Sequence, residues 1–188
     1  MPTDVQPADV QPADLASNDS NLRWKTSRAI QIAHSKASKQ AIQFVEEARG
    51  KMTHPDDLRP AFQVLRALRD PATIPVLCRV IDLRDPVDFV AEAGGPFFKD
   101  YYPAAHVLVE IGKKAANVSV RELRMKMSDQ RRECFCWVIG RVEGPQVGRY
   151  VLKLAIDQET DAGREALLNE AVSVFEKLFP LDEVVPAK

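Results

Sequence analysis

Residues 59–83, RPAFQVLRALRDPATIPVLCRVIDL, contain the unit from which we predict the fold. In the first half of this stretch, apolar residues recur at spacings close to three and four, which predicts a helix with one apolar face. These residues are Phe62, Val64, Leu65 and Leu68. In the second half, Ile74, Leu77 and Ile81 form a second apolar face at offsets of zero, three and seven. Neither helix is long enough to be stable alone in water, so each must pack against a neighbour.

An Asp-Pro turn joins the two predicted helices. The carboxylate of Asp70 is suited to accept a backbone amide of the second helix, and Pro71 suits the first helical position, where no N–H is needed. Pro75 follows within one turn, so the second helix either starts there or is distorted in its first turns.

Two looser copies of this unit follow, at residues 103–127 and 133–156. Their first helices carry matching apolar triplets, and their second helices repeat the zero, three, seven pattern. The triplets are Val107, Leu108 and Ile111, then Val138, Ile139 and Val142; the second faces are Val120, Leu123 and Met127, then Val147, Tyr150 and Leu154. Repetition of helix pairs at such lengths predicts an α-solenoid, in which each pair buries its apolar face against the next.

The sequence pattern of these units resembles that of the HEAT-repeat family, particularly the short bacterial HEAT-like repeats. The residues that carry the resemblance are Ala61, Val64, Leu65, Leu68, Asp70, Pro71, Ile74, Pro75 and Leu77, then Ala104, Ala105, Leu108, Ile111 and Gly112, then Trp137, Ile139, Gly140, Val142, Gly144 and Pro145. It covers residues 59–156, about half of the chain. The resemblance implies an all-α superhelix of three to four antiparallel helix pairs, most often used to bind partners. An ordinary helical core with the same Leu and Val spacing is the competing interpretation.

The chain divides into four parts by composition. Residues 1–20 hold four Asp and no Lys or Arg, and we expect a disordered tail there. Residues 21–179 form the predicted helical domain, with capping helices at 21–49 and 162–179 and an insertion at 84–102. Whether residues 21–49 form one helix or two is left open by the pattern. Residues 180–188 are a short tail.

Composition excludes several classes of protein. The net charge is −1, which provides no overall attraction to nucleic acid or acidic membranes. No run of eighteen apolar residues and no signal-peptide pattern occurs in the sequence, and three cysteines in apolar stretches do not make a disulfide framework. We therefore expect a cytoplasmic protein with buried thiols and no membrane partner.

The search for catalytic chemistry finds no motif. The three histidines have no second His or Cys at ligand spacing, and no phosphate-binding loop or nucleophile elbow occurs in the sequence. We expect a non-enzymatic protein without a metal or cofactor.

Aromatic residues gather in the insertion. Phe97, Phe98, Tyr101 and Tyr102 lie within six residues, beside a Gly-Gly-Pro turn. Rigid aromatic side chains on an irregular segment are typical partner-binding anchors. The alternative, slightly favoured, is that the insertion folds back to cover the gap between unequal repeats.

Basic residues gather in residues 113–153, which have a net charge of +6. Five of them fall off the core faces predicted for the second helices: Arg121, Arg124, Lys126, Arg149 and Lys153. In HEAT-like stacks the second helices line the concave side, so these residues are candidates for a basic groove. An ordinary solvated face is the more common meaning of such a run.

Three functions follow from these patterns. The leading hypothesis is a scaffold that binds another protein. The first alternative is a solenoid that binds nucleic acid or phosphate through the basic residues. The second is an enzyme accessory, by resemblance to the HEAT-like repeats of bilin-chromophore lyases, and only the sequence pattern of the repeats supports it.

Overall fold

The computed structural model describes residues 20–50, 55–83 and 102–180, and every regular element in these ranges is a helix. The elements are α1 (Ser20–Gly50), α2 (Pro55–Leu68), the 3-10 helix η3 (Pro71–Thr73), α3 (Ile74–Arg79), α4 (Pro103–Ile111), α5 (Lys113–Glu122), α6 (Asp129–Glu143), α7 (Pro145–Asp157) and α8 (Ala162–Leu178). The all-α prediction is confirmed. Residues 21–49 lie in one unbroken helix of 31 residues.

The Asp-Pro turn forms as its residues predict. The Asp70 carboxylate accepts a hydrogen bond from the Ala72 amide at 2.9 Å, and Pro71 opens the 3-10 turn. Helix α3 then begins at Ile74, one residue before Pro75, so the proline sits in the first turn where its missing N–H leaves no bond broken.

Single glycines join two of the helix pairs. Gly112 ends α4 and caps α5 with φ of 83°, and Gly144 ends α6 and caps α7 with φ of 81°. A side chain is strained in this left-handed region, so glycine is required for a one-residue turn between helices.

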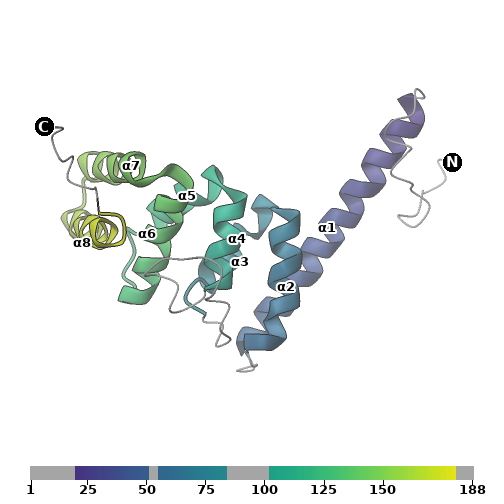
Figure 1. Cartoon of the computed structure of the whole chain (residues 1–188), viewed down its shortest axis with the longest axis horizontal. Helices are drawn as coiled ribbons and strands as arrows, with labels where there is room; N and C mark the ends of the chain where they lie inside the picture. Colours follow the sequence, from purple (N-terminus) through teal and green to yellow (C-terminus); the bar gives the residue numbers. More distant parts are fainter. Residues whose placement is uncertain (1–19, 51–54, 84–101, 181–188) are drawn as a thin grey trace, which may run out of the picture.

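The helices pack in sequence order (Figure 1). Helices α2, α4, α6 and α8 lie side by side, each against the next, and α1, α3 and α5 pack in the same order along the other side. Helix α7 packs against α6 and α8. Helix α1 contacts α2 and α3, and its N-terminal part extends beyond the other helices.

The core is continuous from α1 to α8, with α6 at its centre. Cys134, Phe135, Cys136, Val138 and Ile139 of α6 are all fully buried. Of the predicted second faces, those of the first two units are confirmed, because Ile74, Leu77, Ile81, Val120 and Leu123 are buried and Met127 packs against the core. On α8, Leu168, Ala171 and Phe175 are fully buried.

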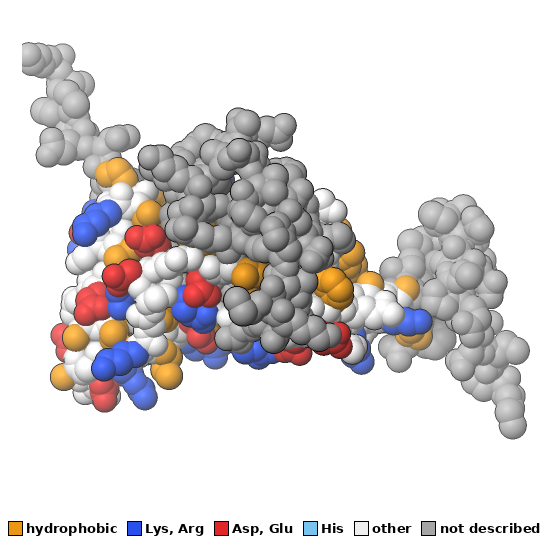
Figure 2. Space-filling model, turned by 90° about the horizontal axis from the view of Figure 1, so that it is seen from below, with side chains coloured by type: hydrophobic (Ala, Val, Ile, Leu, Met, Phe, Trp, Pro, Cys, Tyr) orange, Lys and Arg blue, Asp and Glu red, His pale blue; other side chains and the backbone are white. Residues whose placement is uncertain are grey.

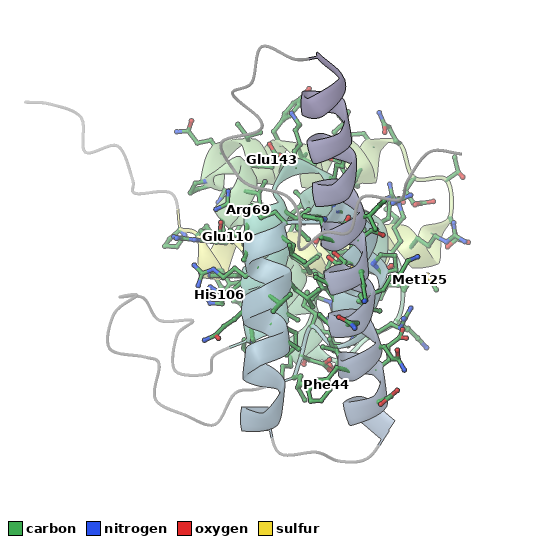
Figure 3. The ribbon with its side chains drawn as sticks, turned by 90° about the vertical axis from the view of Figure 1, so that its right-hand side faces the viewer. Phe44, Arg69, His106, Glu110, Met125 and Glu143 are labelled. Carbon is green, nitrogen blue, oxygen red and sulfur yellow. The ribbon has the colours of Figure 1, made fainter. Side chains whose placement is uncertain are left out.

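Several apolar residues are not fully buried, among them Val64, which was predicted on the apolar face of its helix. Val64 is 40% exposed and Phe44 is 45% exposed. Leu68, Ile111 and Val142 are half-buried, because each lies in the last turn of its helix, where neighbouring helices cover less of the side chain. Phe44 lies near the lower ends of α1 and α2 as drawn in Figure 3.

Ion pairs reinforce the contact between α2 and α4. Arg66 of α2 and Arg69, the residue that follows α2, both pair with Glu110 of α4, at 3.3 Å and 2.8 Å. Arg69 and Glu110 lie next to each other in Figure 3, with His106 further along the same helix as Glu110. Exposed pairs of this kind contribute little to the free energy of unfolding, roughly 0–1 kcal/mol each.

Candidate functional site

Helix α7 carries an exposed apolar row. Val147, Tyr150 and Leu154 are 49%, 66% and 38% exposed. The sequence pattern placed these three residues in the core, and that prediction is wrong. Helix α7 instead turns a different face inward, on which Gly148, Leu152 and Ala155 are buried.

Gly148 explains this orientation of α7. A Cβ at this position would lie 2.6 Å from Cζ of Phe175, a fully buried ring of α8. The missing side chain therefore lets α7 and α8 approach closely, and the bulkier row is left facing solvent. The spacing of apolar residues within α7 therefore predicts the wrong inward face.

The neighbours of the apolar row are polar and of both signs. Gln146, Lys153 and Asp157 are exposed on the same helix. Figure 2 shows apolar, basic and acidic side chains interspersed at the end of the molecule that carries α7 and α8. The apolar row is therefore bordered by exposed polar residues of its own helix.

The five predicted basic residues differ in their surroundings. Arg124 donates to Glu159 at 2.8 Å, and this hydrogen bond holds the pKa of Glu159 below its usual range. Arg149 pairs with Glu176 at 3.3 Å. Lys126 and Lys153 are exposed. Two of the five charges are thus neutralised locally.

Arg121, the fifth basic residue, lies in a groove of about 610 Å³ between α3, α5 and the start of α6. Its described lining is Pro71, Ile74, Pro75, Cys78, Arg79, Val118, Arg121, Glu122 and Arg131. The volume is that of ligand-sized clefts, about 300–1,000 Å³. The sequence analysis missed Arg79 and Arg131, because residues about 40–50 apart in sequence meet here only through packing of the helices.

Arg131 is held in place by the end of α3. Its guanidinium donates to the backbone oxygens of Cys78 at 2.8 Å and Arg79 at 3.2 Å, and to Asp82 at 3.1 Å. Arg79 pairs with Glu46 of α1. Arg121 is exposed and forms no ion pair with any residue that the structure describes.

Of the four aromatic candidates, Phe97, Phe98 and Tyr101 lie outside the described residues. Tyr102 is 4% exposed and forms the N-cap of α4, so it is a core residue in this structure. This burial favours the covering role over the anchor role for Tyr102.

The histidines and cysteines have structural surroundings. His34 hydrogen-bonds the backbone oxygen of Leu68 at 3.0 Å, and the ring of His106 lies 4.7 Å from that of Trp137. Cys78, Cys134 and Cys136 are buried thiols outside any disulfide, as predicted. Over the described ranges, no group of three or more His, Cys, Asp or Glu residues is placed to hold a metal ion. None of the described helices is long and apolar enough to cross a membrane.

Comparison with family models, with curated proteins and with solved structures produced no match to this chain.

Proposed function

We propose that this protein is a non-enzymatic protein–protein interaction module of the cytoplasm, and that the apolar row Val147, Tyr150 and Leu154 on α7 is its docking surface. The observation that carries the proposal is the exposure of this row on a helix whose opposite face is buried. Contiguous exposed apolar residues with a polar border are typical of protein interaction sites.

A HEAT-like stack of helix pairs is part of the proposal. It is supported by the sequential packing of α2, α4, α6 and α8, and by the equivalent glycine turns at Gly112 and Gly144. In such a stack the outer surface of an end pair is not covered by a further repeat. Helix α7 belongs to the last predicted pair, and the capping helix α8 covers one of its faces but leaves the row exposed, so the row is suited to bind a separate protein.

The chemistry of the row indicates the kind of partner. Residues at offsets of zero, three and seven form one ridge along a helix, which matches the apolar face of an amphipathic helix in a partner protein. Tyr150 provides a rigid aromatic contact at the centre, the position where binding energy concentrates in interfaces. Lys153 and Asp157 provide a border of both signs for an equally mixed partner.

The nucleic-acid alternative has less support. Arg124 and Arg149, on which a basic groove depends, are paired with Glu159 and Glu176. No specific observation favours the bilin-lyase alternative over the interaction module.

The test combines partner binding with stability. A triple variant that carries Val147→Ser, Tyr150→Ala and Leu154→Ser should fail to retain a partner protein that the wild type retains from cell extract. Once that partner is purified, Tyr150→Ala alone should weaken binding by about 2 kcal/mol, or roughly thirtyfold. Both variants should melt within a few degrees of the wild type, because none of the three side chains belongs to the buried core.

The matched control is Val64→Ser on α2, where an apolar residue of similar exposure lies outside the row. It should change the affinity less than twofold. Unchanged affinity in the triple variant, or a large fall in its melting temperature, would overturn the proposal.

A further inference from the structure

The groove between α3, α5 and α6 combines an apolar base with a basic border. Ile74 and Cys78 are buried and Val118 is half-buried, and the charged residues of the lining are Arg79, Arg121, Arg131 and Glu122. Because Glu46 and Asp82 already pair with Arg79 and Arg131, Arg121 is the cation best able to take up a further carboxylate. A ligand that fits needs an apolar side chain beside an acidic group.

The chain itself contains such a ligand three times. Residues 4–15 read DVQPADVQPADL, in which Asp4-Val5, Asp9-Val10 and Asp14-Leu15 recur every five residues. Residues 1–19 contain no Lys or Arg, so every charged side chain there is of the sign that the groove attracts. We propose that the groove binds the Asp-Val dipeptides of the chain's own N-terminal segment, in the same molecule.

The length of the chain determines which of the three dipeptides can reach the groove. Glu46, which pairs with Arg79 at the groove, lies 26 residues after Ser20 on α1. At a rise of about 1.5 Å per residue, the groove is therefore roughly 39 Å along α1 from the point where the segment begins. An extended chain covers at most about 3.6 Å per residue, so Asp4 can reach up to roughly 58 Å, Asp9 roughly 40 Å and Asp14 roughly 22 Å. Asp4 reaches the groove with length to spare, Asp9 reaches it only when the intervening chain is fully extended, and Asp14 does not reach it.

Attachment to the same chain makes weak contacts sufficient. A tethered segment has a millimolar effective concentration near its site, so a dipeptide contact that is weak between separate molecules can still keep the groove occupied. The site shares no residue with the α7 row, so its test is independent of the proposed docking function.

The experiment measures how well a free copy of the segment competes with the tethered one. A fluorescein-labelled synthetic peptide of residues 1–19 is titrated with the full chain and followed by fluorescence anisotropy. Asp4→Asn/Asp9→Asn should open the groove and bind the peptide at least about tenfold more tightly than the wild type. Asp14→Asn is the matched control and should behave as the wild type.

Two further variants locate the site. Adding Arg121→Gln to the open variant should weaken peptide binding about tenfold, the effect of one lost charge-assisted hydrogen bond. Adding Lys153→Gln, which removes an exposed charge on α7, should leave it unchanged. Melting curves of all variants should coincide, since Arg121 pairs with no described residue.

Equal affinity of the wild type and the open variant would overturn the proposal, and so would the absence of peptide binding to either. Light scattering at several protein concentrations tests whether the segment in the groove comes from a second copy of the chain. If competition in the wild type disappears on dilution together with an oligomer, the segment comes from a second copy, and occupation within one molecule is wrong.

Discussion

His106 is a residue whose ionisation is constrained by the packing of the helices. Burial between α4 and α6 lowers its pKa to about 4, with Arg66 and Arg141 lowering it further and Glu110 opposing them. The imidazole is therefore neutral in the fold at neutral pH, where it contacts the Trp137 ring. The guanidinium carbon of Arg141 lies over the Trp137 ring, 5.9 Å from the ring centre.

The lowered pKa of His106 predicts an acid-labile contribution to stability. In the unfolded chain the imidazole takes up a proton below its usual pKa of 6.5, whereas the folded chain resists protonation until about pH 4. The contribution of His106 to the free energy of unfolding is thus complete above pH 6.5 and is lost as the pH falls towards 4. Urea titrations should show that the wild type loses about 2 kcal/mol more than His106→Gln between pH 7.5 and 4.5. Equal losses in the two proteins would contradict this assignment.

At the residue scale, sequence reasoning succeeded where one local interaction decides the outcome. The Asp70 cap and the row Ile74, Leu77 and Ile81 depend on neighbours within two turns, and both are as predicted. It failed at Tyr150, because the orientation of α7 depends on Phe175 of another helix filling the space beside Gly148. No periodicity within α7 contains that information.

At the element scale, Arg131 joins α6 to the end of α3. Its bonds to the oxygens of Cys78 and Arg79 satisfy carbonyls that a six-residue helix leaves without intrahelical partners, and Gln130 adds a bond to the backbone oxygen of Asp82 at 2.9 Å. Such a short helix has little stability of its own, so these contacts fix its position.

Arg131→Gln should therefore lower the free energy of unfolding by about 1–3 kcal/mol, because charged donors to α3 are removed. Arg131→Lys should recover part of the loss, since an ammonium can pair with Asp82 but cannot match the geometry of the guanidinium. Lys126→Gln, at an exposed residue, is the control and should be neutral within about 0.5 kcal/mol. Chemical denaturation measures all three, and an Arg131→Gln value equal to the control would refute this role.

Element boundaries were largely predictable, and the exceptions have physical reasons. Asp161 caps α8 at the position where the predicted final helix begins, and Pro145 opens α7 after Gly144. The unbroken α1 was undecided, because Ser35 and Ser38 weaken a helix locally while burial of Ala41 and Val45 stabilises it from outside. The groove could not be predicted, since its residues come from three separate helices.

At the scale of the whole molecule, the helices form a linear series in which each contacts its near neighbours in sequence. A composition of mixed charge and 45% hydrophobic residues is compatible with many helical arrangements, so the order of packing comes from the turns. The glycine joints and the Asp-Pro turn reverse the chain within one to three residues and bring consecutive helices together. In such a series the ends should open more easily than the middle.

The buried thiols make this expectation measurable as a rate of alkylation. Burial raises the pKa of Cys78 and Cys136 to about 12, so neither thiol reacts until its helices separate. Cys136 donates to the Ala171 oxygen of α8 and reports that contact, whereas Cys78 reports α3. Phe175→Ala, which leaves a cavity at α8, should accelerate iodoacetamide labelling of Cys136 far more than that of Cys78. Equal acceleration would mean that the protein opens as one unit; unequal acceleration would mean that Cys136 and Cys78 report two separate openings, each with its own rate.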